Sequence, residues 1–202
     1  MHPDFDLPSP GSITGRSSSI TAAFIQAVIP VVEPTDAEVN EALAILGMKE
    51  GACVCAYCGD SRTEWDHFRP LVSNRRPTGF ITEIANLVPS FGKCNQSKGN
   101  KHWRIWIMSD AKRSPKVRGI KSLSERIERL SAYENWREPK VIDLEKAFGA
   151  ALWTTYWANW QQLLSLMEVS QKVAVQLKAI ATKQLANQPL QPTPDGAAER
   201  RR

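Results

Sequence analysis

CVCAYCGDSRTEWDHFRPLVSNRRPTGFITEIANLVPSFGKCNQSKGN, residues 53–100, holds every cysteine of the chain and most of the side chains suited to chemistry. Four motifs follow one another in it: Cys55-Ala56-Tyr57-Cys58, Asp66-His67 with Pro70 behind it, Asn86-Leu87-Val88-Pro89, and Cys94-Asn95-Gln96-Ser97-Lys98. A Cys-X-X-Cys pair in an intracellular protein binds a metal or does redox chemistry more often than it belongs to a disulfide framework. We therefore expect this stretch to be the functional centre.

The same stretch predicts two strands and then a helix. No helical periodicity is present between Cys53 and Pro89, where short apolar runs alternate with Gly, Asn and Pro. We expect one strand near Thr63–His67 and a second near Asn86–Val88, separated by a polar loop, Ser73–Gly79. After Ser90 the pattern becomes helical and places Asn95 and Lys98 on one face.

The order and spacing of the four motifs resemble the HNH endonuclease family, whose ββα-metal fold cuts DNA with one divalent ion. The resemblance covers about a quarter of the chain. It implies an α+β protein in which a small ββα-metal core carries flanking N-terminal and C-terminal helices. Because the third motif position is Asn, the chain is similar to the HNN variant of the family.

The resemblance also implies a role for each polar residue. His67 would be the general base, Asp66 and Asn95 would hold a catalytic Mg²⁺ or Mn²⁺, and Asn86 would fix the loop and orient His67. The residues expected to bind the substrate are Lys98, Lys93, Lys101, Arg75 and Arg76. The products would carry a 5′-phosphate and a 3′-hydroxyl.

These residue types suit phosphodiester hydrolysis on chemical grounds. A histidine with a near-neutral pKa can deprotonate water, and a hard divalent ion held by oxygen ligands can neutralise the charge that develops on phosphate. Asp66 and His67 are adjacent, so on a strand their side chains point to opposite sides. A bend in the backbone is then needed to bring both to one phosphate.

A structural zinc site is a separate expectation with an irregularity. Many members of the family bind Zn²⁺ through four cysteines, and Cys55, Cys58 and Cys94 fit that pattern. The fourth position, three residues before Cys94, is Phe91. Either Cys53 replaces the missing ligand, or three thiolates bind zinc weakly, or the site stays empty and Phe91 packs there.

The flanking sequence predicts helices. Residues 1–34 are expected to be a mobile leader with a short helix at 21–29, followed by a lead-in helix at 35–50 that Thr35 and Glu38 begin with a capping box and Gly47 ends. The nuclease core then covers 51–109, with a last helix from Lys101 to about Met108, and a helical C-terminal region covers 110–186. Residues 187–202 are expected to be a disordered tail.

Two helices are expected in the C-terminal region. Ser122 and Glu125 predict a capping box for the first helix, which would run to about Tyr133. Asp143 predicts the cap of one long final helix, with apolar residues at Leu144, Phe148, Leu152, Tyr156, Trp160, Leu163 and Met167. We interpret this stripe as core packing. A surface for a homodimer or a partner subunit is the alternative.

Charge and hydropathy favour a cytoplasmic protein that binds nucleic acid. Residues 93–140 hold 13 Lys and Arg against 5 Asp and Glu, whereas residues 1–92 hold 6 against 11. The positive charge therefore begins where the motifs end, as expected if phosphates pass over that surface. No apolar run approaches the roughly 20 residues that span a bilayer, and Asp4 and Asp6 argue against a secretory signal.

The sequence thus predicts a metal-dependent DNA endonuclease of the restriction, phage-defence or mobile-element type. A non-catalytic nucleic-acid-binding module, or an inactive HNH subunit of a larger complex, is the alternative.

Overall fold

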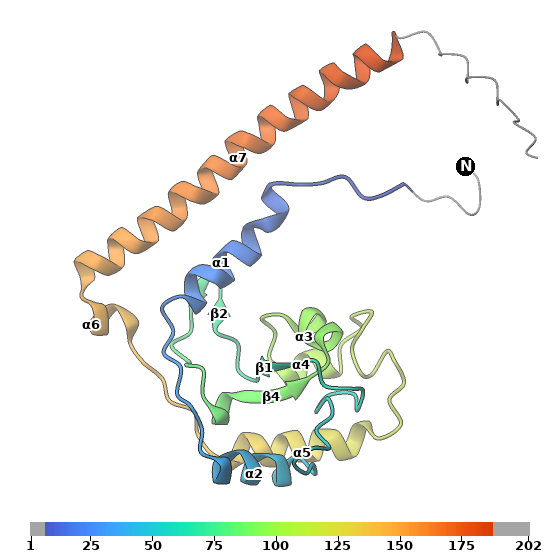
Figure 1. Ribbon diagram of the computed structural model, residues 1–202, viewed down its shortest axis with the longest axis vertical. Helices are drawn as coiled ribbons and strands as arrows, with labels where there is room; N and C mark the ends of the chain where they lie inside the picture. Colours follow the sequence, from blue (N-terminus) through green and yellow to red (C-terminus); the bar gives the residue numbers. More distant parts are fainter. Residues whose placement is uncertain (1–6, 188–202) are drawn as a thin grey trace, which may run out of the picture. The chain divides into compact units, whose positions relative to one another are not determined.

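The computed structural model describes residues 7–187 and contains a ββα unit (Figure 1). Strand β1 (Glu64–His67) pairs antiparallel with β4 (Leu87–Ser90), and helix α3 (Gly92–Lys98) follows β4. The register sets His67 opposite Leu87. The α+β fold with a small core and flanking helices is confirmed.

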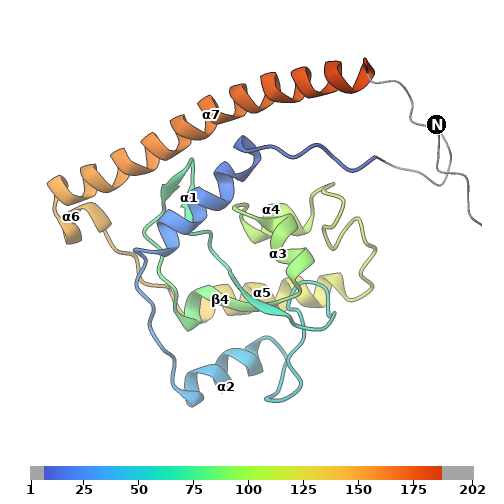
Figure 2. The same ribbon diagram turned by 45° about the horizontal axis from the view of Figure 1, so that its top comes forward.

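Short helices precede, interrupt and follow this unit along the chain. They are η1 (Thr14–Arg16), α1 (Ser17–Gln26), α2 (Asp36–Ile45), η2 (Ile84–Asn86), α4 (Trp103–Ile107) and α5 (Leu123–Trp136). Figure 2 shows α3 and α4 lying next to each other above the β1–β4 sheet. The capping box of α2 is present as predicted, because the Thr35 hydroxyl accepts from the Glu38 N–H and the Glu38 carboxylate accepts from the Thr35 N–H.

An aromatic core holds the ββα unit against α4 and α5. The Phe68 ring stacks on Trp103 at 5.3 Å and meets Tyr133 edge-on at 5.6 Å. Tyr133 also donates its hydroxyl to the carbonyls of Ile84 and Leu87. One side chain of α5 therefore fixes the turn that leads into β4.

The expected loop at 73–79 contains a hairpin. Strands β2 (Val72–Ser73) and β3 (Arg76–Pro77) pair there, and Asn74 and Arg75 adopt positive φ angles of 50° and 61°. Positive φ at both central residues is the geometry of a tight two-residue hairpin turn.

The C-terminal helices differ from the prediction in two ways. Ser122 makes no cap, because its hydroxyl accepts from the Arg126 guanidinium at 3.1 Å instead. The single final helix is broken at Gly149, whose φ of +84° ends α6 (Leu144–Phe148) before α7 (Ala150–Ala186) begins. Asp143 does cap α6, by accepting from the Lys146 N–H at 3.0 Å.

The apolar stripe is only partly buried. Leu144, Trp160 and Met167 are buried, whereas Leu152 is 65% exposed and Phe148 39%. The interpretation of the whole stripe as core is therefore wrong.

The short helix expected at 21–29 within the leader is present as α1, which begins at Ser17 and ends at Gln26, a few residues earlier than predicted at both ends. The part of the leader before residue 7, and the tail after residue 187, lie outside the described residues.

The chain divides into two units. The larger is Ser18–Ala158, which contains the whole site discussed below, and the smaller combines residues 1–17 with 159–202. Over the described residues, no helix is long and apolar enough to cross a membrane.

Candidate functional site

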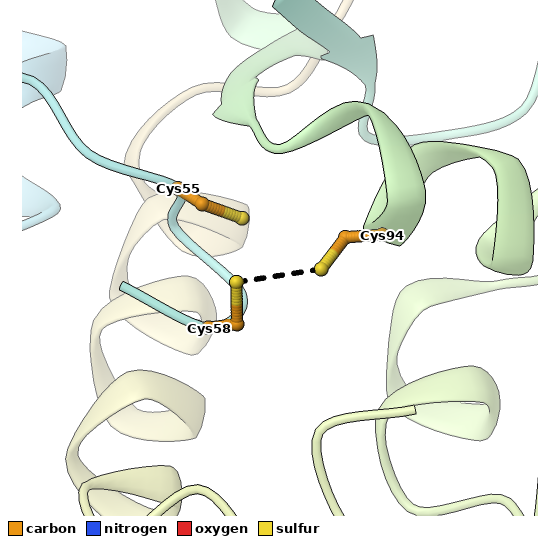
Figure 3. Close-up of side chains that lie close together, drawn as sticks. All are labelled: Cys55, Cys58 and Cys94. Atoms are coloured by element: carbon orange, nitrogen blue, oxygen red, sulfur yellow. Dashed lines mark hydrogen bonds between the residues drawn. The ribbon is translucent and has the colours of Figure 1, made fainter. Parts of the chain in front are cut away.

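Three cysteines from two distant segments gather in the core (Figure 3). The sulfur atoms of Cys55, Cys58 and Cys94 lie within 4.8 Å of one another, and all three residues are buried. The Cys58 and Cys94 sulfurs are 3.4 Å apart. Zn–S bonds of about 2.3 Å in a tetrahedral site separate sulfurs by roughly 3.8 Å, so this group fits one Zn²⁺.

The protonation of the cluster also suits a metal. Hydrogen bonds from Cys58 and Cys94 lower the pKa of Cys55. The pKa of Cys94 is raised, because Cys94 is hydrogen-bonded to Cys55 and Cys58. A lowered pKa at Cys55 favours the thiolate, which is the form of cysteine that binds metals.

The structure does not bring Cys53 into this group. Cys53 is half-buried and lies near Arg62, and burial raises its pKa. The sulfur of Cys53 does not lie within 4.8 Å of the sulfurs of all three other cysteines. The replacement of the missing ligand by Cys53 is thus not supported by its position.

Phe91 and Arg118 border the cluster instead. The Phe91 ring packs against the core, and its backbone N–H acts to lower the pKa of Cys55. The Arg118 guanidinium lies 3.6 Å from the Cys94 sulfur and 2.6 Å from an Asp60 oxygen. Asp60 and Arg118 lie outside the four motifs, so motif spacing did not predict that they would lie beside the cysteines.

Asp66 is buried among donors. The Tyr57 hydroxyl donates to it at 2.7 Å, and the Lys98 ammonium lies 3.1 Å and 3.0 Å from its two oxygens. Burial raises the pKa of Asp66, while Lys98 and Tyr57 act in the opposite direction. A buried carboxylate requires such partners, because an unpaired charge inside a protein is very costly.

Lys98 lies inside the fold, not on the surface where it was expected to contact phosphate. Only 1% of its side chain is exposed. Its ammonium also donates to the carbonyls of His67 at 2.9 Å and Gly99 at 3.4 Å. The ammonium is thus fully occupied by groups of the chain itself.

His67 points away from Asp66, as the alternation of a strand requires. Its Nε2 lies 2.8 Å from the Thr82 hydroxyl. Burial, together with the Lys98 charge, lowers the pKa of His67 to about 4. The imidazole is therefore neutral at pH 7.

Asn86 ties η2 to the residues that follow β1. It is fully buried, accepts from the Arg69 N–H at 2.7 Å and donates to the Ile81 carbonyl at 3.2 Å. The Phe68 N–H donates to its backbone carbonyl at 2.8 Å. Asn86 thereby holds the backbone just after His67.

Asn95 pairs with a residue that was not singled out from the sequence. Its amide donates to the Glu64 carboxylate at 2.8 Å. Glu64 stands two residues before Asp66 on β1 and therefore on the same side of the strand. That spacing was the only sequence signal for Glu64, and a two-residue spacing alone is weak.

The other cations expected to bind substrate lie on the surface. Lys93, Lys101 and Arg75 are exposed, and Arg76 lies with its guanidinium 4.5 Å from the centre of the Trp157 ring. Arg75 and Arg76 belong to the β2–β3 hairpin, whereas Lys93 and Lys101 lie on and just after α3. These residues therefore do not form one cluster around His67.

Comparison with known proteins gives one partial likeness. A stretch of 98 residues, 46% of this chain, is 37% identical to part of the CRISPR-associated endonuclease Cas9 of Corynebacterium diphtheriae. The matched stretch spans 8% of the length of that Cas9. No family model matches the chain, and no solved structure matches it.

Proposed function

We propose that this chain is a metal-dependent endonuclease of the HNH type that hydrolyses DNA phosphodiester bonds. The observation that carries the proposal is the ββα unit that joins a neutral His67 and a buried Asp66 on β1 to Asn95 on α3. The partial likeness to Cas9, which is named an endonuclease, supports the same class of reaction.

His67 has the properties of a general base. Its lowered pKa leaves the ring unprotonated at neutral pH, so it can accept the proton of an attacking water. Thr82 holds Nε2 by a hydrogen bond, and Asn86 fixes the backbone behind the ring. Both contacts limit the positions that the imidazole can take.

Oxygen ligands for a hard divalent ion are available on β1 and α3. Asp66 and Asn95, with Glu64 added from the structure, would hold Mg²⁺ or Mn²⁺. A bound ion would neutralise the charge that develops on the phosphate and on the leaving oxygen. Lys98 supplies positive charge at Asp66, so its ammonium has to leave that carboxylate before an ion can bind there.

The three buried cysteines would hold a structural Zn²⁺. They connect the segment before β1 to α3, and thus the two ends of the ββα unit. A metal in this position stabilises the fold and does no chemistry itself.

One observation favours a second candidate, a non-catalytic nucleic-acid-binding module or an inactive subunit of a larger complex. Both oxygens of Asp66 are paired with Lys98 inside the fold. A permanent ion pair there would prevent Asp66 from binding a catalytic ion, and the chain could then bind nucleic acid through its basic surface but not cleave it.

The exposed apolar side chains of α7 suggest a second copy of the chain as a partner. Exposed apolar side chains recur on this helix at alternating spacings of three and four residues: Leu163, Leu166, Val173, Leu177 and Ile180. The position between Leu166 and Val173 in this repeat is the polar residue Ser170. This spacing is typical of a coiled coil, in which identical helices bury the same stripe against each other.

Incubation of supercoiled plasmid DNA with the protein and Mg²⁺ or Mn²⁺ tests the proposed function. We expect nicked or linear DNA whose new ends carry 5′-phosphates, and no product when EDTA is added. Intact plasmid with every divalent ion, from a protein that is folded by circular dichroism, would favour the non-catalytic candidate.

A further inference from the structure

A basic surface lies on the other side of α3 from the catalytic residues. Lys93, Gln96 and Ser97 share one face of this helix, and Asn95 and Lys98 point to the opposite face. Two adjoining hollows of about 310 Å³ and 360 Å³ open on the first face, and Lys93, Lys112 and Arg113 line both. We call these three cations the distal basic cluster.

The backbone that carries the distal basic cluster is held in place. Ser114, which is fully buried, donates to the Ser109 carbonyl at 2.6 Å and accepts from the Val117 N–H at 3.2 Å. The Trp106 indole donates to the Ser97 hydroxyl at 3.0 Å and so joins α4 to α3. The backbone that carries Lys112 and Arg113 is therefore tied to the end of α4, and α4 is tied to α3, which carries Lys93.

The acids near this surface already have partners. Asp110 pairs with Lys116 at 2.9 Å, and Asp60 pairs with Arg118 at 2.6 Å. Among residues 7–187, no acidic side chain pairs with Lys93, Lys112 or Arg113. Three cations held together without anions create a positive potential that attracts a polyanion.

The lining of the hollows indicates which polyanion fits. Lysine, arginine, a glutamine amide and a serine hydroxyl are donors to phosphate oxygens. Phe91, at one end of the second hollow, is the only aromatic side chain of the two linings, so neither hollow forms a stacking pocket for a base. The hollows thus suit backbone phosphates better than a free nucleotide.

We propose that the distal basic cluster binds backbone phosphates of DNA, as a contact separate from the catalytic centre. The choice of DNA as the polyanion rests on the proposed function. The contact is independent of sequence and holds the duplex while His67 faces the bond to be cut. It adds Lys112 and Arg113 to the residues that bind substrate.

Binding of a fluorescein-labelled DNA duplex, measured by anisotropy in EDTA over a range of salt concentrations, tests this proposal without catalysis. The test variant is Lys93→Gln/Lys112→Gln/Arg113→Gln. The control is Lys49→Gln/Lys140→Gln, which removes two exposed cations elsewhere in the same unit, so the two variants are compared per charge removed. Thermal unfolding checks that both variants are folded.

We expect the test variant to bind at least tenfold more weakly at low salt. The slope of log K against log salt should become shallower by about 2 to 3, since each lost phosphate contact contributes about 0.9. The control should keep the wild-type slope. A test variant that binds like wild type, a control that loses as much, or a wild-type protein that does not bind the duplex would overturn the proposal.

The outcome is distinct from that of the cleavage assay. If the protein leaves the plasmid intact but the test variant shows this change of slope, the distal contact is supported and the nuclease assignment is contradicted. If the protein cleaves the plasmid but the test variant shows no change of slope, the nuclease assignment is supported and the distal contact is contradicted.

Discussion

Lys98 determines whether Asp66 can hold a divalent ion. The ammonium and a metal ion would compete for the same two carboxylate oxygens, which lie 3.1 Å and 3.0 Å from Nζ. In the ion-free protein Lys98 is therefore a counter-charge that keeps a buried carboxylate tolerable.

Replacement of Lys98 by Met should expose this competition. Without metal, the variant should lose about 3–5 kcal/mol of unfolding free energy, because the buried Asp66 loses its partner. Mn²⁺ should then raise the melting temperature of the variant more than that of wild type. Thermal unfolding with and without Mn²⁺ measures both effects, and Lys101→Met, at an exposed lysine, is the control. Equal responses to Mn²⁺ in wild type and Lys98→Met would refute the competition.

Zinc content tests the assignment of the cysteines. Cys94→Ser should lose bound zinc, because its sulfur is one of three within 4.8 Å of each other. Cys53→Ser should keep the wild-type zinc content, because Cys53 lies outside that group. Elemental analysis of the purified proteins gives the stoichiometry. Loss of zinc from Cys53→Ser would show that Cys53 is the fourth ligand after all.

The sequence was sufficient to predict some features of the site. The alternation of a strand predicts that Asp66 and His67 face opposite sides, and the structure places them so. The burial of Lys98 and the pairing of Asn95 with Glu64 were not predictable, because both depend on where α3 packs against β1. Long-range packing of this kind leaves no periodicity in the chain.

At the scale of elements, local signals succeeded where the backbone has few choices. The capping box at Thr35 and the strands beside Asp66 follow from short-range rules. The same capping pattern failed at Ser122, where Arg126 bonds to the hydroxyl. Gly149 ends α6 because its φ is positive, a conformation that glycine adopts readily. The sequence does not distinguish such a glycine from one that is tolerated within a helix, so this break was not predicted.

The link between α2 and α5 should respond to acid. The Thr35 N–H and the Arg137 guanidinium lower the pKa of Glu38 from 4.5 to about 2. A carboxyl with a lowered folded-state pKa stabilises the protein above its unfolded pKa, and this stabilisation disappears as the pH falls from about 4.5 to 2. Glu38→Gln should therefore show a shallower loss of melting temperature over that range. Parallel curves for wild type and variant would contradict this role for Glu38.

At the scale of the whole molecule, charge and apolar surface are placed on different elements. The cations of the distal basic cluster lie on α3 and on the segment after α4, whereas the exposed apolar stripe lies on α7. This separation allows one chain to bind DNA through one surface and a second copy through another.

The mass in solution tests the role of the α7 stripe. We expect light scattering coupled to size exclusion to give the mass of a dimer, and Leu166→Glu/Leu177→Glu to give that of a monomer, because charges would enter a buried seam. Val175→Glu/Leu185→Glu, at two exposed apolar residues of α7 that lie off this repeat, is the matched control. A monomeric wild-type protein would exclude the second copy as partner.

The most direct test of the account is the rate of plasmid cleavage under single-turnover conditions with Mg²⁺ or Mn²⁺, compared for wild type, His67→Ala and His102→Ala. His102 is partly exposed and lies 3.4 Å from Glu134, so its loss controls for the removal of an imidazole. We predict that His67→Ala lowers the rate by a factor of about 10² to 10⁴, as expected for a lost general base, while His102→Ala stays close to wild type. Equal rates for wild type and His67→Ala would contradict the assignment of His67 as the base.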